Sequence, residues 1–362
     1  MKIELQCKLY DSFRVQQIAG MFDVPVTAKL CTEIEVEPPP SIDDDWQIGC
    51  IVGSSGSGKS QLSKHIYGDR LYGAQEWERD KAVVDCFGDR DIKEIVGTLT
   101  AVGFSSPPSW IRPYHTLSNG EQFRCDLARA LLQGGLVVFD EFTSVVDRTV
   151  AKIGSAAISK AIKSGKINTR FIAVSCHHDI VEWLEPDWVL DVNTGIVSRR
   201  LLRRPPIELQ IYKCHRNSWR LFAKHHYLDS KELSTSSQCY VALFDGQPVS
   251  FCSVMANVGH KGRRRISRIV TLPDYQGIGI GKRLLNFIAQ KYKNEGLRIS
   301  IGTSHPAFVQ SLCRDEQWVM TSVNESGQNK GTTDKTKGLR NSIIIGRKVA
   351  CFEYVGTKSN LQ

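Results

Sequence analysis

Short apolar runs alternate with longer mixed segments over the first 200 residues. Ile48–Val52, Leu136–Phe139 and Phe171–Ser175 are largely apolar over four or five positions, which predicts buried strands. Gly120–Leu132 lies between two of these runs and predicts a helix. Strands that alternate with helices are typical of a mostly parallel sheet covered on both faces. We therefore expect an α/β domain in this half of the chain.

The pattern changes after Arg199–Pro206, where two adjacent prolines interrupt regular structure. Beyond this segment strand-like runs are frequent, Gly281–Tyr292 predicts an amphipathic helix, and the polar, glycine-rich Asn324–Ser342 predicts a loop. The predicted strands are Cys239–Leu243, Val249–Met255, Ile266–Leu272, Ile299–Gly302 and Ile343–Tyr354. The sequence thus predicts two domains, residues 1–200 and residues 207–362.

Charge divides the chain at the same place. Residues 1–200 contain 22 Lys and Arg against 27 Asp and Glu, a net charge of −5. Residues 201–362 contain 25 against 11, a net charge of +14. A positive field of this size favours an anionic partner, although solubility also accounts for part of it.

Composition narrows the class of protein. The 362 residues contain no run of 18 uncharged apolar residues, and the first residues do not resemble a secretory signal. The 11 cysteines include no CxxC pair, so neither a disulfide framework nor a zinc site is indicated. We expect a cytoplasmic protein without a membrane segment.

A phosphate-loop motif follows the first predicted strand. The segment GSSGSGKS matches GxxxxGK[ST], and a potential helix follows it. Glycines let backbone N–H groups surround phosphates at a helix N-terminus. Lys59 would reach the terminal phosphates of ATP, and the Ser60 hydroxyl would bind Mg²⁺. The expected ATP-binding residues are Gly53, Ser54, Ser55, Gly56, Ser57, Gly58, Lys59 and Ser60.

Two carboxylates end a later apolar strand, Leu136–Glu141. Asp140 would hold Mg²⁺ through water, and Glu141 would polarise the attacking water.

Three further segments make the first 200 residues resemble the ABC ATPase family. Leu117–Arg124, LSNGEQFR, is similar to the signature LSGGQxxR, and Ser144–Asp147 resembles the D-loop. His178 resembles the switch histidine, with His177 as the alternative. The resemblance covers roughly residues 10–200. It implies a composite site in which Ser118 and Gly120 of one subunit face the phosphate loop of another, and hence an ATP-dependent homodimer.

The signature departs from the family pattern, because Asn119 replaces a glycine and Glu121 replaces a glutamine. An acidic residue at the second position is familiar in soluble ABC ATPases that act on nucleic acid or ribosomes. Leu117 follows Ser60 by only 57 positions, which implies a small helical subdomain.

The sequence offers two candidates each for the Q-loop residue and for the aromatic residue that stacks on adenine. Asp85 lies where the apolar segment KAVVDCF would end as a strand, whereas Gln75 lies earlier in the chain than the Q-loop is expected. Phe13 or Phe22 could stack on adenine, but aromatic residues so far upstream are more often core.

A second glycine loop follows the predicted strand Ile266–Leu272 and resembles motif A of the GNAT superfamily. Gln276, Gly279 and Gly281 match its [QR]xxGx[GA] pattern, and Gly277 and Lys282 belong to the same loop. The resemblance covers roughly residues 207–355. It implies an α+β domain with a mixed sheet flanked by helices, and acetyl-CoA or another acyl-CoA whose pyrophosphate lies against the loop.

The general acid and base are less defined. The family's tyrosine acid falls on Ser311, and His226, His225, Tyr227 or His305 could remove the acceptor's proton. An ordinary polar role is the alternative for each.

The basic residues of the second half indicate what kind of molecule could accept the acyl group. Arg216, Arg220 and Lys224 interleave with Trp219 and Phe222, and Lys261–Arg265 forms a cluster in an apparent hairpin loop. These residues could bind the phosphates of DNA or RNA or simply be solvated.

Our leading hypothesis is an ATP-coupled acyltransferase that acts on a nucleic acid or an associated amine, and FAKHHYLD and RIVTLPDYQG are loosely similar to phage-type GNAT-like DNA-modification enzymes. The alternatives are an ATPase switch whose GNAT fold only binds CoA or a partner, a small-molecule acetyltransferase with a regulatory ATPase and, least favoured, a transport ATPase.

Overall fold

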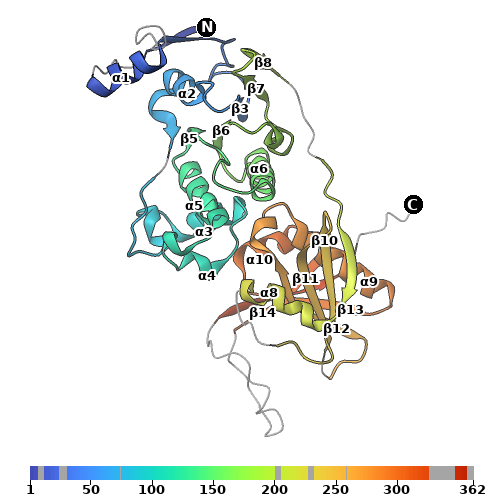
Figure 1. Cartoon of the computed structure of the whole chain (residues 1–362). Helices are drawn as coiled ribbons and strands as arrows, with labels where there is room; N and C mark the ends of the chain where they lie inside the picture. Colours follow the sequence, from blue (N-terminus) through green and yellow to red (C-terminus); the bar gives the residue numbers. More distant parts are fainter. Residues whose placement is uncertain are drawn as a thin grey trace. The chain divides into compact units, whose positions relative to one another are not determined.

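The structure is a computed structural model that describes residues 1–6, 12–23, 31–73, 75–199, 205–226, 232–257, 259–325 and 347–356. Its contacts divide the chain into two compact units, each with its own sheet (Figure 1). Unit 1 comprises Met1–Phe104 and Ser109–Pro206, and unit 2 comprises Ser105–Pro108 and Ile207–Gln362.

Unit 1 is built on a six-stranded sheet of order β4-β5-β6-β3-β7-β8, in which only the pair β7–β8 is antiparallel. The strands are β3 (Ile48–Val52), β4 (Leu71–Tyr72), β5 (Gly135–Phe139), β6 (Thr169–Ser175), β7 (Trp188–Asp191) and β8 (Ile196–Ser198). A separate antiparallel pair consists of β1 (Lys2–Gln6) and β2 (Cys31–Glu35). The helices along the described part of residues 1–199 are α1 (Phe13–Phe22), α2 (Lys59–Tyr67), α3 (Ile92–Ala101), α4 (Pro107–Trp110), α5 (Asn119–Leu131), α6 (Arg148–Lys163) and α7 (Val181–Leu184). The predicted α/β character and the three predicted strands of this half are confirmed.

The central strand β3 is fully buried, and its glycine is required by packing. A Cβ atom at Gly49 would lie 2.2 Å from the ring of Trp188, the first residue of the neighbouring strand β7. Trp188 in turn packs edge-on against Trp46, with ring centroids 5.5 Å apart. On the α5 side, Phe123, Phe139 and Phe142 form an aromatic cluster. Both sides of the strand that leads to the phosphate loop are therefore rigidly packed.

Two expectations for unit 1 are wrong. The segment around Asp85 forms a 3₁₀-helix, Val83–Phe87, rather than a strand, because only Val83 and Phe87 of its apolar residues are fully buried. Phe13 and Phe22 are 77% and 69% exposed on α1, which buries none of its residues, so they are not core.

Unit 2 contains a seven-stranded sheet of order β14-β15-β13-β12-β11-β10-β9. All neighbours are antiparallel except β12 and β13, which makes the sheet mixed. The strands are β9 (Gln210–Cys214), β10 (Gln238–Phe244), β11 (Gln247–Ala256), β12 (Arg263–Thr271), β13 (Arg298–Thr303), β14 (Trp318–Glu325) and β15 (Lys348–Tyr354). The helices are α8 (Trp219–Phe222), α9 (Ile280–Asn294) and α10 (Pro306–Cys313).

Helices cover both faces of this sheet. Phe251 of β11 stacks on Phe222 of α8, with ring centroids 5.5 Å apart. Its neighbour Cys252 points the other way and pairs with Tyr240, whose hydroxyl bonds that of Tyr292 on α9. The α+β architecture expected for the second half is thereby confirmed.

Three details of unit 2 differ from expectation. The strand β14 was not predicted, because its side chains after Trp318 are exposed and show no apolar pattern, and it includes Asn324 of the predicted loop. Arg263, Arg264 and Arg265 begin β12 instead of lying in a hairpin loop. Described residues of β15 begin at Lys348, and 326–346 lie outside the described residues. Within the described ranges, no helix has the length and apolar character that a membrane span requires.

Candidate functional sites

The phosphate loop connects β3 to α2, and its shape depends on glycine. Gly56 and Gly58 have φ of 79° and 85°, and Gly58 is the N-cap of α2. These left-handed conformations are disfavoured for residues with a Cβ. At Gly53 a Cβ would lie 2.8 Å from the Ser57 hydroxyl oxygen. The loop therefore turns tightly at a helix N-terminus, where backbone N–H groups favour an anion.

Polar side chains hold this loop in shape. The Lys59 ammonium donates to the Ser54 carbonyl at 2.6 Å, and only 8% of this residue is exposed. The Ser57 hydroxyl oxygen is buried and has no hydrogen-bond partner among the described residues. Asn193, just after β7, accepts hydrogen bonds from the Ser54 N–H at 3.2 Å and from its hydroxyl at 2.9 Å. A bound phosphate would supply the missing partner and a counter-charge for Lys59.

The candidate Mg²⁺ ligands lie together, Ser60 in the first turn of α2 and Asp140 directly after β5. The Ser60 hydroxyl donates to Asp140 Oδ1 at 3.0 Å. The same oxygen accepts the Glu141 N–H at 2.9 Å, and Ser144 donates to Glu141 Oε2 at 2.5 Å. Glu141 adopts φ of 51°, a left-handed conformation rare for a residue with a side chain. The described residues include no cluster of three or more His, Cys, Asp or Glu, but a hydroxyl and a carboxylate suit Mg²⁺, which keeps several waters.

The signature segment begins α5. Ser118 is its N-cap, and Glu121 completes a capping box by accepting from the Ser118 N–H at 3.0 Å. Glu121 also accepts from the Ser109 hydroxyl at 2.8 Å. A carboxylate is favoured in the first turn of a helix, so the departure from glutamine has a structural role here. Gly120 is buried, whereas Ser118 is exposed.

The segment after β6 carries the two candidate switch histidines. The His177 N–H donates to the Ser175 hydroxyl at 3.2 Å, and His178 begins a 3₁₀-helix, His178–Ile180. The adjacent Asp179 accepts a hydrogen bond from Arg148 Nε at 3.1 Å. Partial burial would raise the pKa of Asp179, but its bonds and ion pairs with Arg148 and Lys152 lower it overall.

Strand β4 precedes Gln75, one of the two positions considered for the Q-loop. Tyr72 of β4 pairs with Phe139 of β5, and the Tyr72 carbonyl accepts the Asp140 N–H at 3.0 Å. Gln75 follows three residues after Tyr72, and its side-chain amide donates to the Gly73 carbonyl at 3.3 Å. The sequence could not reveal β4, because a two-residue strand gives no periodicity. Asn193 was missed for a similar reason, since it belongs to no motif.

In unit 2 a second loop has a similar construction. Gly277 and Gly279 have φ of 89° and 95°, and Gly279 is the N-cap of α9. A Cβ at Gly281 would lie 2.7 Å from the Thr271 hydroxyl oxygen. Gln276 donates to the Thr271 carbonyl at 2.9 Å, which ties the loop to the end of β12.

Strands β12 and β13 separate next to this loop. Their parallel register pairs Arg263–Ile266 with Arg298–Ile301, while β12 continues to Thr271 along β11 alone. A register shift between Ser253 and Val254 on β11 marks the point of separation. Beyond this point, the edge of β12 that faces β13 has no strand partner in the described part of the chain.

Lys282 and Ser311 are connected. The Lys282 ammonium lies 3.0 Å from Asp315 Oδ2 and 3.2 Å from the Ser311 carbonyl oxygen. Burial would raise the pKa of Asp315, but the Gln317 N–H, Asn286 and Lys282 lower it overall. Lys282 thus links α9 to α10, and its charge is partly compensated.

The described histidine and aromatic candidates of unit 2 are partly or fully buried. His226 packs against Trp219 with ring centroids 5.6 Å apart, and burial lowers the pKa of His305, the N-cap of α10. Trp219 and Phe222 are 3% and 0% exposed, so these aromatics belong to the core and are not available to stack on bases. Tyr227 lies outside the described residues.

Comparisons with known proteins agree with this division. Residues 207–309 match the family model described as Acetyltransferase (GNAT) family. The energy-coupling factor transporter ATP-binding protein EcfA1 of Mycoplasma genitalium is 27% identical over an alignment of 186 residues that covers 40% of this chain. The match spans 65% of that relative's length. This chain therefore joins a unit similar to ABC-type ATPases to a unit that matches the GNAT family model.

Two solved structures are similar to parts of this chain. MJ0796, a bacterial ABC transporter cassette, is 16% identical with a TM-score of 0.38 and covers 49% of this chain and 94% of its own. An IAA acetyltransferase from Bacillus cereus is 16% identical with a TM-score of 0.29 and covers 41% of this chain and 99% of its own.

The Asn193 contact predicts local protection of the phosphate loop. Asn193→Ala removes the acceptor of the Ser54 N–H, so exchange of that amide hydrogen should accelerate about fivefold, the equivalent of one neutral hydrogen bond. Asn193→Asp keeps an acceptor oxygen and should retain the protection. Hydrogen exchange resolved by NMR measures both, and equal rates in the wild type and Asn193→Ala would contradict the contact.

Proposed function

We propose that this protein hydrolyses Mg-ATP in unit 1 and transfers an acyl group from CoA in unit 2. One observation carries the proposal: each unit ends a strand in a loop with two glycines at positive φ, the second of which caps a helix. Two such loops suit two phosphate-bearing ligands, ATP and the pyrophosphate of CoA.

In unit 1 the residues Gly53–Ser60 would surround the phosphates, and Ser60 with Asp140 would hold Mg²⁺. The metal would neutralise charge that develops on the phosphates. Glu141 would orient and polarise the attacking water, since its carboxylate follows the strand end that carries Asp140. His178 would contact the terminal phosphate as the switch histidine.

A second copy of the chain would complete this site. The chain has one signature segment, and its Ser118 is exposed at the N-terminus of α5. In a two-fold dimer the exposed N-terminus of α5 could reach the phosphate loop of the partner, as the resemblance to ABC ATPases implies.

In unit 2 the separation of β12 from β13 would admit the pantetheine arm, with Gln276–Gly281 on the pyrophosphate. Thioesters are activated, so holding an amine beside the carbonyl supplies much of the rate. His226 or His305 would take the amine's proton, and His305 is favoured as a neutral acceptor because burial lowers its pKa. Ser311 would occupy the position of the general acid, where its hydroxyl is a weaker donor than tyrosine.

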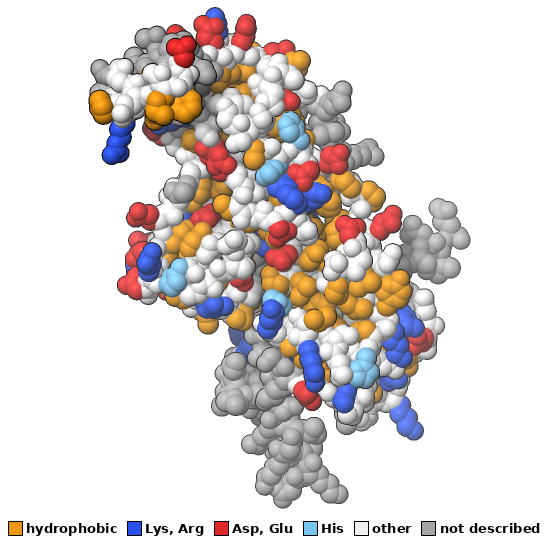
Figure 2. Space-filling model, in the orientation of Figure 1, with side chains coloured by type: hydrophobic (Ala, Val, Ile, Leu, Met, Phe, Trp, Pro, Cys, Tyr) orange, Lys and Arg blue, Asp and Glu red, His pale blue; other side chains and the backbone are white. Residues whose placement is uncertain are grey.

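We propose DNA or RNA, or an amine bound to it, as the acyl acceptor. The +14 charge of residues 201–362 supports this reading. Figure 2 shows Lys and Arg side chains gathered along the margin of unit 2 on the face in view, while acidic side chains are frequent on unit 1. A small-molecule amine is the second candidate, because the aromatics between the basic residues are buried.

Loss of the Glu141 carboxylate should stop hydrolysis and trap the dimer. Glu141→Gln keeps the shape but cannot polarise water, so ATP turnover should fall about 10²- to 10⁴-fold. Light scattering of this variant with Mg-ATP should show a doubled mass, whereas Lys59→Ala should stay monomeric through lost phosphate contacts. Glu182→Gln on α7 is the control. Wild-type turnover in Glu141→Gln would refute the assignment.

The motif A loop predicts a sharp dependence of CoA binding on glycine. Gly279→Val places a branched side chain at φ of 95° where the pyrophosphate must approach, so calorimetry should detect no acetyl-CoA binding. Gly296→Val carries the same strain at φ of 75° in open space and should bind as the wild type does. Equal binding by the two variants would argue against this site.

The acceptor proposal predicts salt-dependent binding of oligonucleotides. Alternation along β12 places Arg263 and Arg265 on one face and Arg264 on the other. If Arg263 and Arg265 contact phosphates, changing both to Gln should reduce the slope of log affinity against log salt by about 2, whatever the base sequence. Fluorescence anisotropy with DNA and RNA measures this, and Arg90→Gln in unit 1, whose guanidinium is paired with Glu94, is the control. No binding at low salt, with or without ATP, would favour the small-molecule acceptor.

A further inference from the structure

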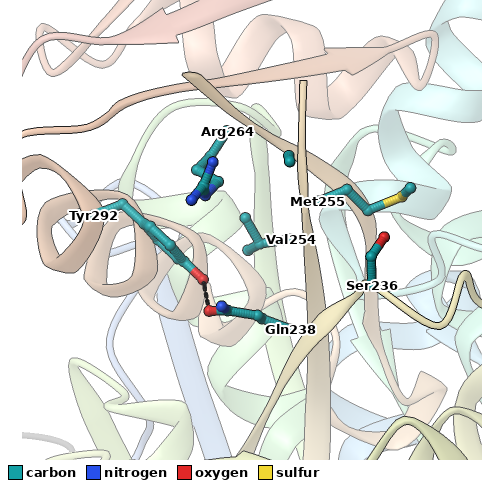
Figure 3. Close-up of a pocket in the computed structure, with 7 residues that line it drawn as sticks. Ser236, Gln238, Val254, Met255, Arg264 and Tyr292 are labelled. Atoms are coloured by element: carbon teal, nitrogen blue, oxygen red, sulfur yellow. Dashed lines mark hydrogen bonds between the residues drawn. The ribbon is translucent and has the colours of Figure 1, made fainter. Parts of the chain in front are cut away.

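A small cavity lies on the α9 side of the unit 2 sheet, away from the motif A loop. Its volume is about 90 Å³, and Gln238, Val254, Arg264 and Tyr292 line it together with Ser236 (Figure 3). Arg264 is near the beginning of β12, whereas the loop follows its end. Tyr292 lies twelve residues after the start of α9, about 18 Å along the helix axis. The acyltransferase site as proposed does not use this cavity.

The floor of the cavity is buried and its polar groups are oriented. Tyr292 and Val254 are each 1% exposed. The Tyr292 hydroxyl donates to Gln238 Oε1 at 2.5 Å and lies 3.0 Å from the Tyr240 hydroxyl oxygen. This bond fixes the Gln238 amide so that its NH₂ group is left to donate elsewhere. Burial, and secondarily the bond to Tyr240, raises the pKa of Tyr292, so no phenolate forms here at neutral pH.

Arg264 brings a positive charge to this cavity. Figure 3 shows its guanidinium facing Tyr292 and Gln238. In the described part of the chain Arg264 makes no ion pair, and its hydrogen bond to the Arg263 carbonyl at 3.3 Å uses one of its five N–H groups. The cavity lining contains no acidic residue that would oppose this charge.

We propose that this cavity binds a compact oxyanion, a phosphate or carboxylate head group, through the Arg264 guanidinium and the Gln238 amide. A guanidinium fork matches two oxygens of either anion, and the amide NH₂ and the Ser236 hydroxyl add donors at the rim. The volume of about 90 Å³ suits such a head group. The neutral tyrosine floor supplies no opposing charge. This inference does not depend on acyl transfer or ATP hydrolysis.

The test is a titration of the full chain with inorganic phosphate or acetate, at constant ionic strength adjusted with chloride. Saturating Mg-ADP and CoA are present so that both glycine loops are occupied. NMR shifts of residues that line the cavity should saturate with a dissociation constant on the order of 1 mM, as suits one charged fork and neutral donors in an open site. Saturation by phosphate alone or by acetate alone identifies the head group.

Matched variants assign the binding to the cavity. Arg264→Gln should weaken binding about 10- to 100-fold, because a charged partner is lost. Arg265→Gln removes the same charge from the opposite face of β12 and should leave binding within about twofold, since screened charges act weakly. Gln238→Met, an exposed position, should weaken it about three- to tenfold through the lost amide donors. No saturable binding of either anion, or equal losses in Arg264→Gln and Arg265→Gln, would overturn the proposal.

Discussion

Main-chain N–H groups can converge on a phosphate only where the chain turns sharply and no Cβ stands in the way. This steric condition governs both units. Gly58 caps α2 and Gly279 caps α9 at positive φ, and in each loop a further glycine, Gly53 or Gly281, lies against a hydroxyl oxygen less than 3 Å from where its Cβ would be. The partial positive charge at each helix start then faces the same point as the loop N–H groups. The flanking strands hold the loops because their cores are closely packed.

This constraint explains which parts of the structure the sequence could predict. A strand, a glycine loop and a helix that follow one another directly form a pattern within a short stretch of sequence. For this reason β3, β12 and their loops could be predicted. The buried strands β5 and β6 were visible because their apolar runs are continuous. By contrast, β4 has two residues and β14 is mostly exposed, and neither produces an apolar pattern.

Residues that act through distant partners were the hardest to predict. Asn193 reaches the phosphate loop from a position 139 residues later, and no local pattern marks it. The Arg263–Arg265 cluster was visible as charge, but its place on a strand separates Arg264 from its neighbours by the alternation of side chains. Trp219 and Phe222 showed the opposite problem, because aromatics next to basic residues resembled a binding surface while tertiary packing places them in the core.

The contact between Gly49 and Trp188 restricts which substitutions related sequences can accept at these two positions. An alanine at 49 would collide with the indole, whereas a smaller residue at 188 would remove the obstacle and leave a void. Because neither change is favourable alone, we expect the two positions to covary through rare paired substitutions. Relatives that keep tryptophan at 188 are then restricted to glycine at 49, while those that have lost it are free to carry a larger residue on the strand before the phosphate loop.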